Sequence, residues 1–203
     1  MLSLIYFTGI QTMQAKLFTS IALLSMAILP RASMAAWEIE PSHTHVSFAV
    51  GHMGLTHTPG LFRSVSGTVN FDENNITASS VSLSMDTASV DTAHAQRDEV
   101  LRSADWFNAQ AYPKITFVST GVQRVDATHY LVAGNLTVRG KSVPVTFNTT
   151  MTGPVANPFL KVPSVGFSGS AHVSRSAFGM QTYLPVIADD VELIFQLEMN
   201  KVP

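Results

Sequence analysis

The sequence alternates between apolar and polar side chains in one stretch after another, and this pattern limits the folds open to it. A period of two places successive side chains on opposite faces of a β-strand, so that one face is buried and the other faces water. The alternation recurs eight times, in residues 37–53, 60–71, 77–86, 114–125, 130–138, 143–151, 165–173 and 191–199. The sequence therefore predicts an all-β protein.

The lengths and connections of these stretches indicate how the sheet is arranged. Residues 60–71 change parity between Phe62 and Val65, which predicts a β-bulge around Arg63–Ser64. Gly140-Lys141 predicts a tight hairpin. Long strands joined by short turns favour an eight-stranded antiparallel barrel, because closure removes exposed sheet edges. A two-sheet sandwich is the alternative.

One helical insertion is expected between the third and fourth strands. Asp91 is a suitable N-cap, and residues 92–101 contain good helix formers without Gly or Pro. A second short turn follows with Trp106 and Phe107 on its apolar face, and Pro113 ends the segment. We expect this insertion to act as a plug or lid on the barrel.

The first 35 residues have the features of a cleaved secretory signal peptide. Lys16 precedes the apolar run of residues 17–29, and small residues precede the expected cleavage before Ala36. Met13 is a plausible alternative start. Removing Lys16 and Arg31 from the 12 basic residues leaves 10 against 14 acidic ones, a formal net charge of −4. We expect a periplasmic protein that does not bind nucleic acid.

The chain has no cysteine, which excludes disulfides, thiolate metal sites and thiol nucleophiles. His43 and His45 have a spacing that suits two metal ligands, but no third or fourth ligand is evident, and no metal site is expected. There is no G-x-S-x-G nucleophile motif and no Gly-rich phosphate loop. No catalytic residues and no cofactor are predicted.

Five motifs along the chain carry a family resemblance. They are WEIEPSHTHVSFAVGHM (37–53), GLFRSVSGTVNFD (60–72), RDEVLRSADWFNAQAYPKITFVST (97–120), GNLTVRGKSVPV (134–145) and RSAFGM (175–180). In this order they resemble the YceI-like family of exported polyisoprenoid-binding proteins. The resemblance implies a lipocalin-like barrel over residues 36–203, often a homodimer, with an elongated cavity for an isoprenoid quinone or polyprenol. Val100 and Ala177 stand where the family often has a histidine and an acidic residue.

Ten apolar or aromatic residues are the candidates for contact with such a ligand. Periodicity alone predicts that they fill a core, whereas the resemblance implies that they line a cavity. They are Phe48, Val50, Phe71, Leu83, Phe117, Tyr130, Leu136, Phe147, Phe167 and Phe195.

Four polar residues are candidates for contact with a ligand head group or for structural roles. His52 shares the parity of Phe48 and Val50 and is expected at the wall or mouth of the cavity. Arg97 and Asp98 are expected to anchor the helical insertion, with Asp98 and Arg102 at the spacing of a surface ion pair. Arg175 is expected to bond several carbonyls at a corner, or to hold a polar head.

The sequence thus favours an exported binding protein, not an enzyme, that carries or sequesters a long isoprenoid lipid and makes transient contact with membranes. One alternative is a partner-binding or stress-response barrel with a filled core. A second alternative is an enzyme acting on a lipid-like substrate, with Arg97, Asp98 and His52 as its polar set.

Overall fold

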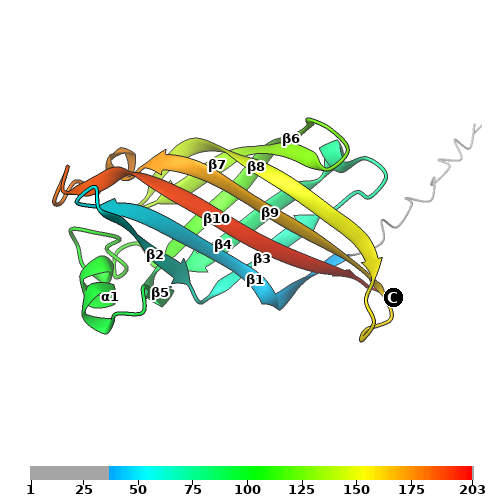
Figure 1. The fold of residues 1–203 in the computed structure, drawn as a ribbon, viewed down its shortest axis with the longest axis horizontal. Helices are drawn as coiled ribbons and strands as arrows, with labels where there is room; N and C mark the ends of the chain where they lie inside the picture. Colours follow the sequence, from blue (N-terminus) through cyan, green and yellow to red (C-terminus); the bar gives the residue numbers. More distant parts are fainter. Residues whose placement is uncertain (1–36, 203) are drawn as a thin grey trace, which may run out of the picture. The chain divides into compact units, whose positions relative to one another are not determined.

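The computed structural model describes residues 37–202 and shows one curled antiparallel sheet (Figure 1). The predicted signal peptide lies outside the described residues. The strands are β1 (Trp37–His52), β2 (Thr56–Phe62), β3 (Val65–Asn70), β4 (Ser80–Asp86), β5 (Val90–Asp91), β6 (Lys114–Arg124), β7 (His129–Val138), β8 (Lys141–Ala156), β9 (Pro163–Ser174) and β10 (Ile187–Lys201). The helical elements are α1 (Ala95–Arg102) and the 3₁₀ turns η1 (Ile76–Ala78), η2 (Thr87–Ser89) and η3 (Arg175–Phe178).

The predicted all-β class is confirmed, although the sheet has ten strands and not eight. The expected second strand is divided in two at Arg63–Ser64, where the bulge was predicted. Ser64 accepts a hydrogen bond from the backbone N–H of Asp86 (3.0 Å), and its hydroxyl donates to the Asp86 carboxylate (2.8 Å). These bonds turn the chain away from β1, so that β2 pairs with β1 and β3 pairs with β4. The two-residue strand β5 accounts for the other difference.

Strand order explains why the sheet must curl. The order is β3-β4-β6-β7-β8-β9-β10-β1-β2-β5, so β2 and β3 lie near opposite edges. Only Arg63 and Ser64 separate β2 from β3, and the three residue steps from Phe62 to Val65 span about 11 Å at most. The two edges must therefore meet, and the sheet forms a half-barrel. Side chains pack across the meeting point as well, with the rings of Trp37 and Phe71 edge to face at 5.3 Å.

The register of the strands directs one set of apolar side chains inward. Phe48 pairs with Leu193, and Phe117 pairs with Leu136. These residues belong to one buried cluster, together with the partly buried Leu193. The register shifts between Val50 and His52, because Val50 pairs with Val191 whereas His52 pairs with Ile187. His52 is the last residue of β1 and is exposed, so the parity argument is wrong where it placed this residue in the cavity wall.

The helical insertion is present, but it begins later than predicted. The N-cap is His94, whose Nδ1 accepts from the backbone N–H of Arg97 (3.2 Å), and not Asp91. The Asp91 carboxylate is already engaged, because it accepts from the backbone N–H of Ala93 (2.7 Å) and pairs with Arg63. Asp91, the last residue of β5, therefore stabilises the turn that precedes α1 and does not cap the helix.

The ion pair expected between Asp98 and Arg102 does not form. Asp98 is 6% exposed and accepts from both the backbone N–H (2.8 Å) and the hydroxyl (2.6 Å) of Thr92. Arg102 instead donates to the carbonyls of Ala88 (2.8 Å) and Val90 (3.1 Å). Arg97 also bonds Thr92, at its hydroxyl and its carbonyl (both 2.7 Å). These contacts tie α1 to the turn that precedes it.

Substitution of Asp98 by Ala should therefore destabilise the protein by about 2–3 kcal/mol. The backbone N–H and the hydroxyl of Thr92 would both lose the carboxylate that accepts their hydrogen bonds and would stay buried. Urea denaturation followed by circular dichroism measures the change. The exposed neighbour Glu99 is the matched control, and Glu99→Ala should change stability by less than about 0.5 kcal/mol. Equal effects of the two substitutions would contradict an anchoring role for Asp98.

Candidate ligand-binding cavity

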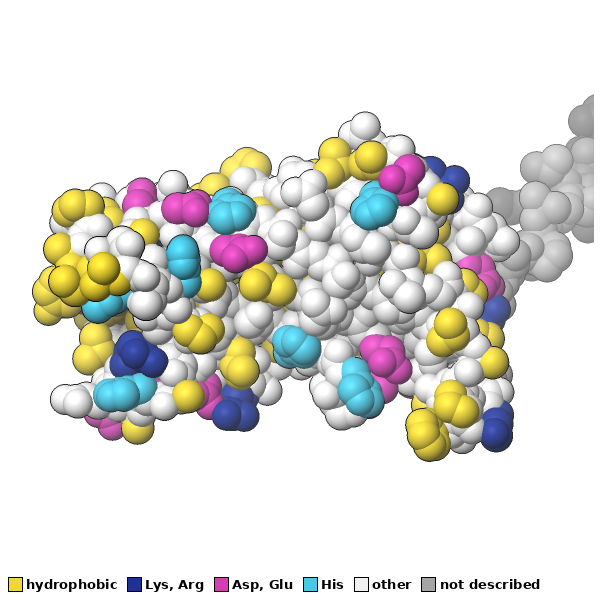
Figure 2. All heavy atoms as spheres, viewed as in Figure 1, with side chains coloured by type: hydrophobic (Ala, Val, Ile, Leu, Met, Phe, Trp, Pro, Cys, Tyr) yellow, Lys and Arg dark blue, Asp and Glu magenta, His cyan; other side chains and the backbone are white. Residues whose placement is uncertain are grey.

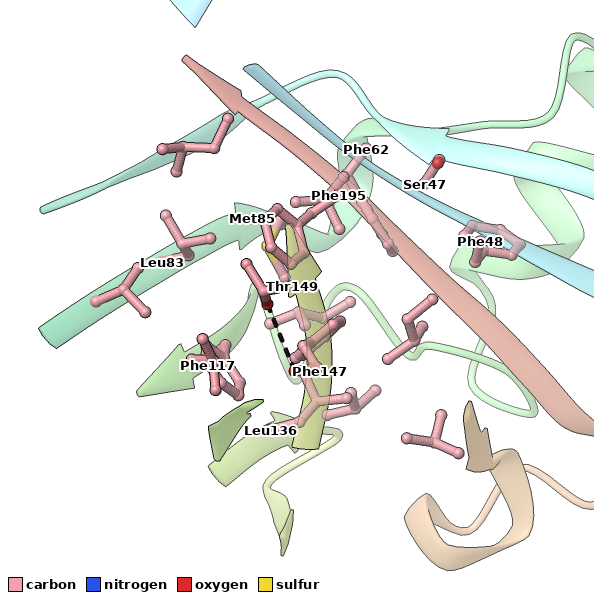
Figure 3. Close-up of a pocket in the computed structure, with 18 of the residues that line it drawn as sticks. Ser47, Phe48, Phe62, Leu83, Met85, Phe117, Leu136, Phe147, Thr149 and Phe195 are labelled. Atoms are coloured by element: carbon pink, nitrogen blue, oxygen red, sulfur yellow. Dashed lines mark hydrogen bonds between the residues drawn. The ribbon is translucent and has the colours of Figure 1, made fainter. Parts of the chain in front are cut away.

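The inside of the half-barrel holds an apolar cavity of about 200 Å³. Figure 3 shows its wall, with Phe48, Leu83, Phe117 and Phe147 directed into the same space from different strands. Most of the lining is aliphatic or aromatic. The polar groups at its wall come from a few side chains, among them Tyr130, Thr149 and Arg175. Such a space suits a hydrocarbon chain and offers few groups for reading a polar head.

The structure brings eleven of the fourteen candidate residues to this cavity. They are Phe48, Val50, Phe71, Leu83, Phe117, Tyr130, Leu136, Phe147, Phe167, Phe195 and Arg175. The other three, His52, Arg97 and Asp98, are not part of the lining. Arg97 and Asp98 are directed to Thr92 by the hydrogen bonds described above.

Several lining residues were missing from the candidates. Leu101, Trp106 and Phe107 come from the helical insertion, and Phe178 and Met180 come from the corner around η3. The apolar pair Trp106 and Phe107 is visible in the sequence. Its position over the cavity follows from tertiary packing, which strand periodicity does not report.

Aromatic rings organise the cavity in three groups. In the middle, Phe147 packs edge to face against Phe117 (5.3 Å between centroids) and Phe195 (5.5 Å). Beside the insertion, Phe107 contacts Phe62 (5.6 Å) and Phe48 (6.3 Å). The third group is Trp37, Phe71 and Phe167, in which Phe71 contacts both other rings. Edge-to-face pairs of this kind add about 0.5–1.5 kcal/mol each beyond burial.

Arg175 is the one lining residue with a full charge, and backbone carbonyls surround it. Its guanidinium donates to the carbonyls of Met180 (2.8 Å), Ala188 (2.9 Å), Ile187 (2.9 Å) and Thr182 (3.0 Å), and it is 3% exposed. Burial lowers the pKa of Arg175, and the charge of Asp189 opposes that change. Its guanidinium carbon also lies 5.0 Å from the centre of the Trp106 ring. Arg175 therefore joins the corner to the insertion.

The carboxylate nearest to this corner is itself stabilised in its charged form. The hydroxyl of Ser176 donates to Asp189 (2.7 Å), as does the Ser176 backbone N–H (2.8 Å). The hydroxyl bond is the main reason that the pKa of Asp189 lies below its usual range, and Arg175 adds to the effect. Asp189 follows Ala188 on β10, where it fixes the start of η3.

Other polar groups do not gather at the cavity. The imidazole–carboxylate contacts His172–Asp190 and His129–Asp126 are exposed and lie away from the cavity lining. Within residues 37–202, no three His, Asp or Glu side chains come together in a way that would hold a metal ion. No helix in that part of the chain is both long and apolar enough to cross a membrane.

The fold and the cavity define a class: a lipocalin-like antiparallel barrel with an apolar interior. Residues 37–199 match the model of the YceI-like domain, and the chain therefore belongs to the YceI-like family. A UPF0312 protein of Pectobacterium atrosepticum is 34% identical over 180 residues, covering 89% of this chain and 93% of its own. Protein YceI of Escherichia coli O157:H7 is 36% identical over 159 residues, covering 78% and 82%.

Solved structures share the same architecture. BcnA of Burkholderia cenocepacia superposes with a TM-score of 0.72 at 29% identity, covering 79% of this chain and 99% of its own. A polyisoprenoid binding domain from Saccharophagus degradans superposes with a TM-score of 0.60, covering 83% and 99%. Its sequence identity is 14%, so that likeness concerns the fold alone.

Arg175→Lys should destabilise the protein by about 2–4 kcal/mol, because an ammonium group cannot reach four carbonyls arranged for a planar guanidinium. Thermal unfolding measures the loss. The exposed cation Arg63 gives a comparison, since Arg63→Lys keeps a charge beside Asp91 and should have a small effect. A fully stable Arg175→Lys protein would contradict the structural role of this side chain.

Proposed function

We propose that this protein binds one long isoprenoid lipid, such as a quinone or polyprenol, inside the barrel and carries or sequesters it in the periplasm. The observation that carries this proposal is the apolar cavity enclosed by eleven of the predicted residues. The polyisoprenoid binding domain of Saccharophagus degradans, which shares the fold, is consistent with it. The signal-like features of residues 1–35 support export.

Binding of such a lipid would depend on its chain more than on its head. Each methylene group transferred from water to an apolar site gains about 0.8 kcal/mol. The lipid otherwise resides in a membrane. The distribution of lipid between membrane and protein therefore depends only on the difference in its free energy between these two apolar environments. A protein of this kind exchanges lipid with membranes instead of holding it irreversibly.

The alternative enzyme hypothesis has little geometric support. It assigned the chemistry to Arg97, Asp98 and His52. Arg97 and Asp98 both bond Thr92, and His52 is exposed at the end of β1. A partner-binding barrel with a filled core remains the main competitor, and the presence of extractable lipid separates it from our proposal.

Native mass spectrometry of protein purified from its own periplasm, followed by analysis of the organic extract, tests the proposal. We expect a bound mass that matches an isoprenoid quinone or polyprenol. An unliganded mass, together with failure to take up quinone from liposomes, would favour the filled core.

Phe117→Asp should abolish lipid binding, because an aspartate in the cavity must lose its hydration or its charge. Uptake of a quinone from liposomes is the measurement. Val118 on the same strand is 50% exposed, so Val118→Asp controls for a new charge without entering the cavity. If Phe117→Asp folds and still extracts lipid, the cavity is not the binding site.

Membrane contact is expected at the end of the barrel that carries the β1–β2 hairpin. Exposed apolar side chains gather there, on that hairpin and on the loop before β10: Met53, Leu55, Tyr183, Leu184 and Val186. The two loops are joined by a hydrogen bond from the Met53 N–H to the Val186 carbonyl (2.8 Å). Figure 2 shows these hydrophobic side chains grouped at the left end of the molecule.

Charge and position support a membrane as the partner of this patch. Residues 51–62 and 176–188 contain no Asp, Glu, Lys or Arg, so entry into a lipid interface buries no full charge. The cavity-lining residues Val50 and Val173 come from the strand ends next to these loops, and Arg175 begins η3 directly after β9. A lipid chain leaving the cavity at this end would enter the membrane directly.

Leu55→Asp should slow the uptake of quinone from liposomes about tenfold while leaving affinity in detergent micelles unchanged, because Leu55 is 76% exposed and lies outside the cavity lining. Stopped-flow fluorescence gives the rate. Val125→Asp, in the exposed turn between β6 and β7, is the control. A shift from dimer to monomer in Leu55→Asp, without a change in uptake rate, would instead identify the patch as a homodimer interface.

A further inference from the structure

Three phenylalanine rings in the cavity wall lie over glycines of neighbouring strands. Phe48 on β1 is paired with Gly60 on β2, and Phe195 on β10 is paired with Gly169 on β9. The third ring, Phe117 on β6, covers Gly134 on β7, the diagonal neighbour of its partner Leu136. Each ring occupies the space that a Cβ atom on its glycine would need.

The distances show how closely each ring approaches the backbone. A Cβ atom on Gly60 would lie 2.7 Å from Phe48 Cε1 and 2.9 Å from Cε2, and closer still to Cζ. On Gly134 it would lie 2.6 Å from Phe117 Cε2, and on Gly169 it would lie 2.6 Å from Phe195 Cε1. Ordinary carbon contacts are about 3.5–4.0 Å. Each ring would have to move by about 1 Å to admit a methyl group.

Not every strand glycine has this relationship. A Cβ atom on Gly121 of β6 would meet nothing within 4 Å, and one on Gly166 of β9 would meet only a carbonyl oxygen at 4.0 Å. Neither Gly60, Gly134 nor Gly169 has the positive φ that demands glycine. Close approach of the ring, rather than backbone conformation, is therefore the common feature of these three positions.

We infer that Gly60, Gly134 and Gly169 determine the width of the cavity, and thereby its ligand, by letting Phe48, Phe117 and Phe195 lie against the barrel wall. This inference rests on the proposed function, because it assumes that a chain occupies the cavity. The cavity of about 200 Å³ is smaller than the roughly 300–1,000 Å³ of common ligand sites. An inward shift of one ring would remove a large part of the space available to a chain.

The ligand class follows from that width. A space bounded by rings from β1, β6 and β10 admits one flexible chain. A lipid with two tails, or a rigid fused-ring molecule, would require several rings to leave the wall together. On this inference the cavity takes single-chain lipids and rejects diacyl lipids.

Gly60→Ala is the sharpest test, because the three nearest atoms to its added Cβ all belong to the Phe48 ring. At Gly134 and Gly169 the methyl group would also meet the carbonyl oxygens of Val118 and Asn148, both at 2.6 Å. Gly60→Ala should weaken binding of geranylgeraniol, a single isoprenoid chain, by about tenfold. Gly121→Ala is the matched control and should bind as the unsubstituted protein does.

A double substitution identifies the ring as the cause. Gly60→Ala combined with Phe48→Leu replaces the obstructing ring by a smaller side chain, and it should recover most of the lost affinity. If Gly60→Ala alone fails to fold while the double variant folds, the ring is again the group that the methyl meets. Full affinity in Gly60→Ala, or a folded double variant no better than a folded Gly60→Ala, would overturn the inference.

Xenon uptake, followed by xenon-129 NMR, reports on the cavity without any lipid. It should fall in Gly60→Ala and recover in the double variant, whereas equal uptake by Gly60→Ala and the unsubstituted protein would overturn the inference. An unsubstituted protein that takes up xenon but not geranylgeraniol would contradict the proposed function. In that case the difference in xenon uptake between Gly60→Ala and the unsubstituted protein would still test whether Gly60 determines the width of the cavity. Dioleoylglycerol, a two-tailed probe, should not bind, and binding as tight as that of geranylgeraniol would overturn the assignment to single chains.

Discussion

The connection of β2 to β3 through two residues is the constraint on which the rest of the structure depends. It joins strands at opposite edges of one sheet, and the sheet can satisfy it only by curling. Curling in turn creates a concave inner face and an interior whose shape is set by side chains. The hydrogen bonds of Ser64 to Asp86 hold the chain at this junction. The cavity is thus a consequence of topology first and of side-chain chemistry second.

Strand periodicity predicted which side chains face the interior, because odd- and even-numbered residues of a regular strand point to opposite faces of the sheet. It succeeded at Phe48, Phe117 and Phe195, which lie in uninterrupted pairing. It did not place His52, which is the last residue of β1 and lies outside the cavity lining, although β1 pairs regularly with β2 as far as His52. Alternation within β1 gives the face of the sheet, but it does not reveal how far along the strand the cavity extends.

The helical insertion shows a different limit. Its existence and its apolar pair follow from local propensity, but its polar contacts do not. Asp98 turns back to Thr92, and Arg102 reaches carbonyls near η2, because the insertion folds against its own preceding turn. Helical spacing favoured an exposed ion pair between them, and the gain from such a pair is small enough for tertiary contacts to override it. The existence of the helical insertion could therefore be predicted from the sequence, whereas tertiary packing determines its polar contacts.

Three of the contacts that attach the insertion share one chemical property. Arg97, Arg102 and Arg139 donate to backbone carbonyls, those of Thr92, Ala88 and Ala104. A carbonyl does not titrate, and a guanidinium stays protonated throughout the range in which proteins function. These three contacts are therefore largely independent of external acidity, unlike the hydrogen bonds that the Asp98 carboxylate accepts from Thr92. They are also less sensitive to salt than pairs of exposed charges. This part of the attachment of the insertion would stay in place while the acidity and salt content of the medium change.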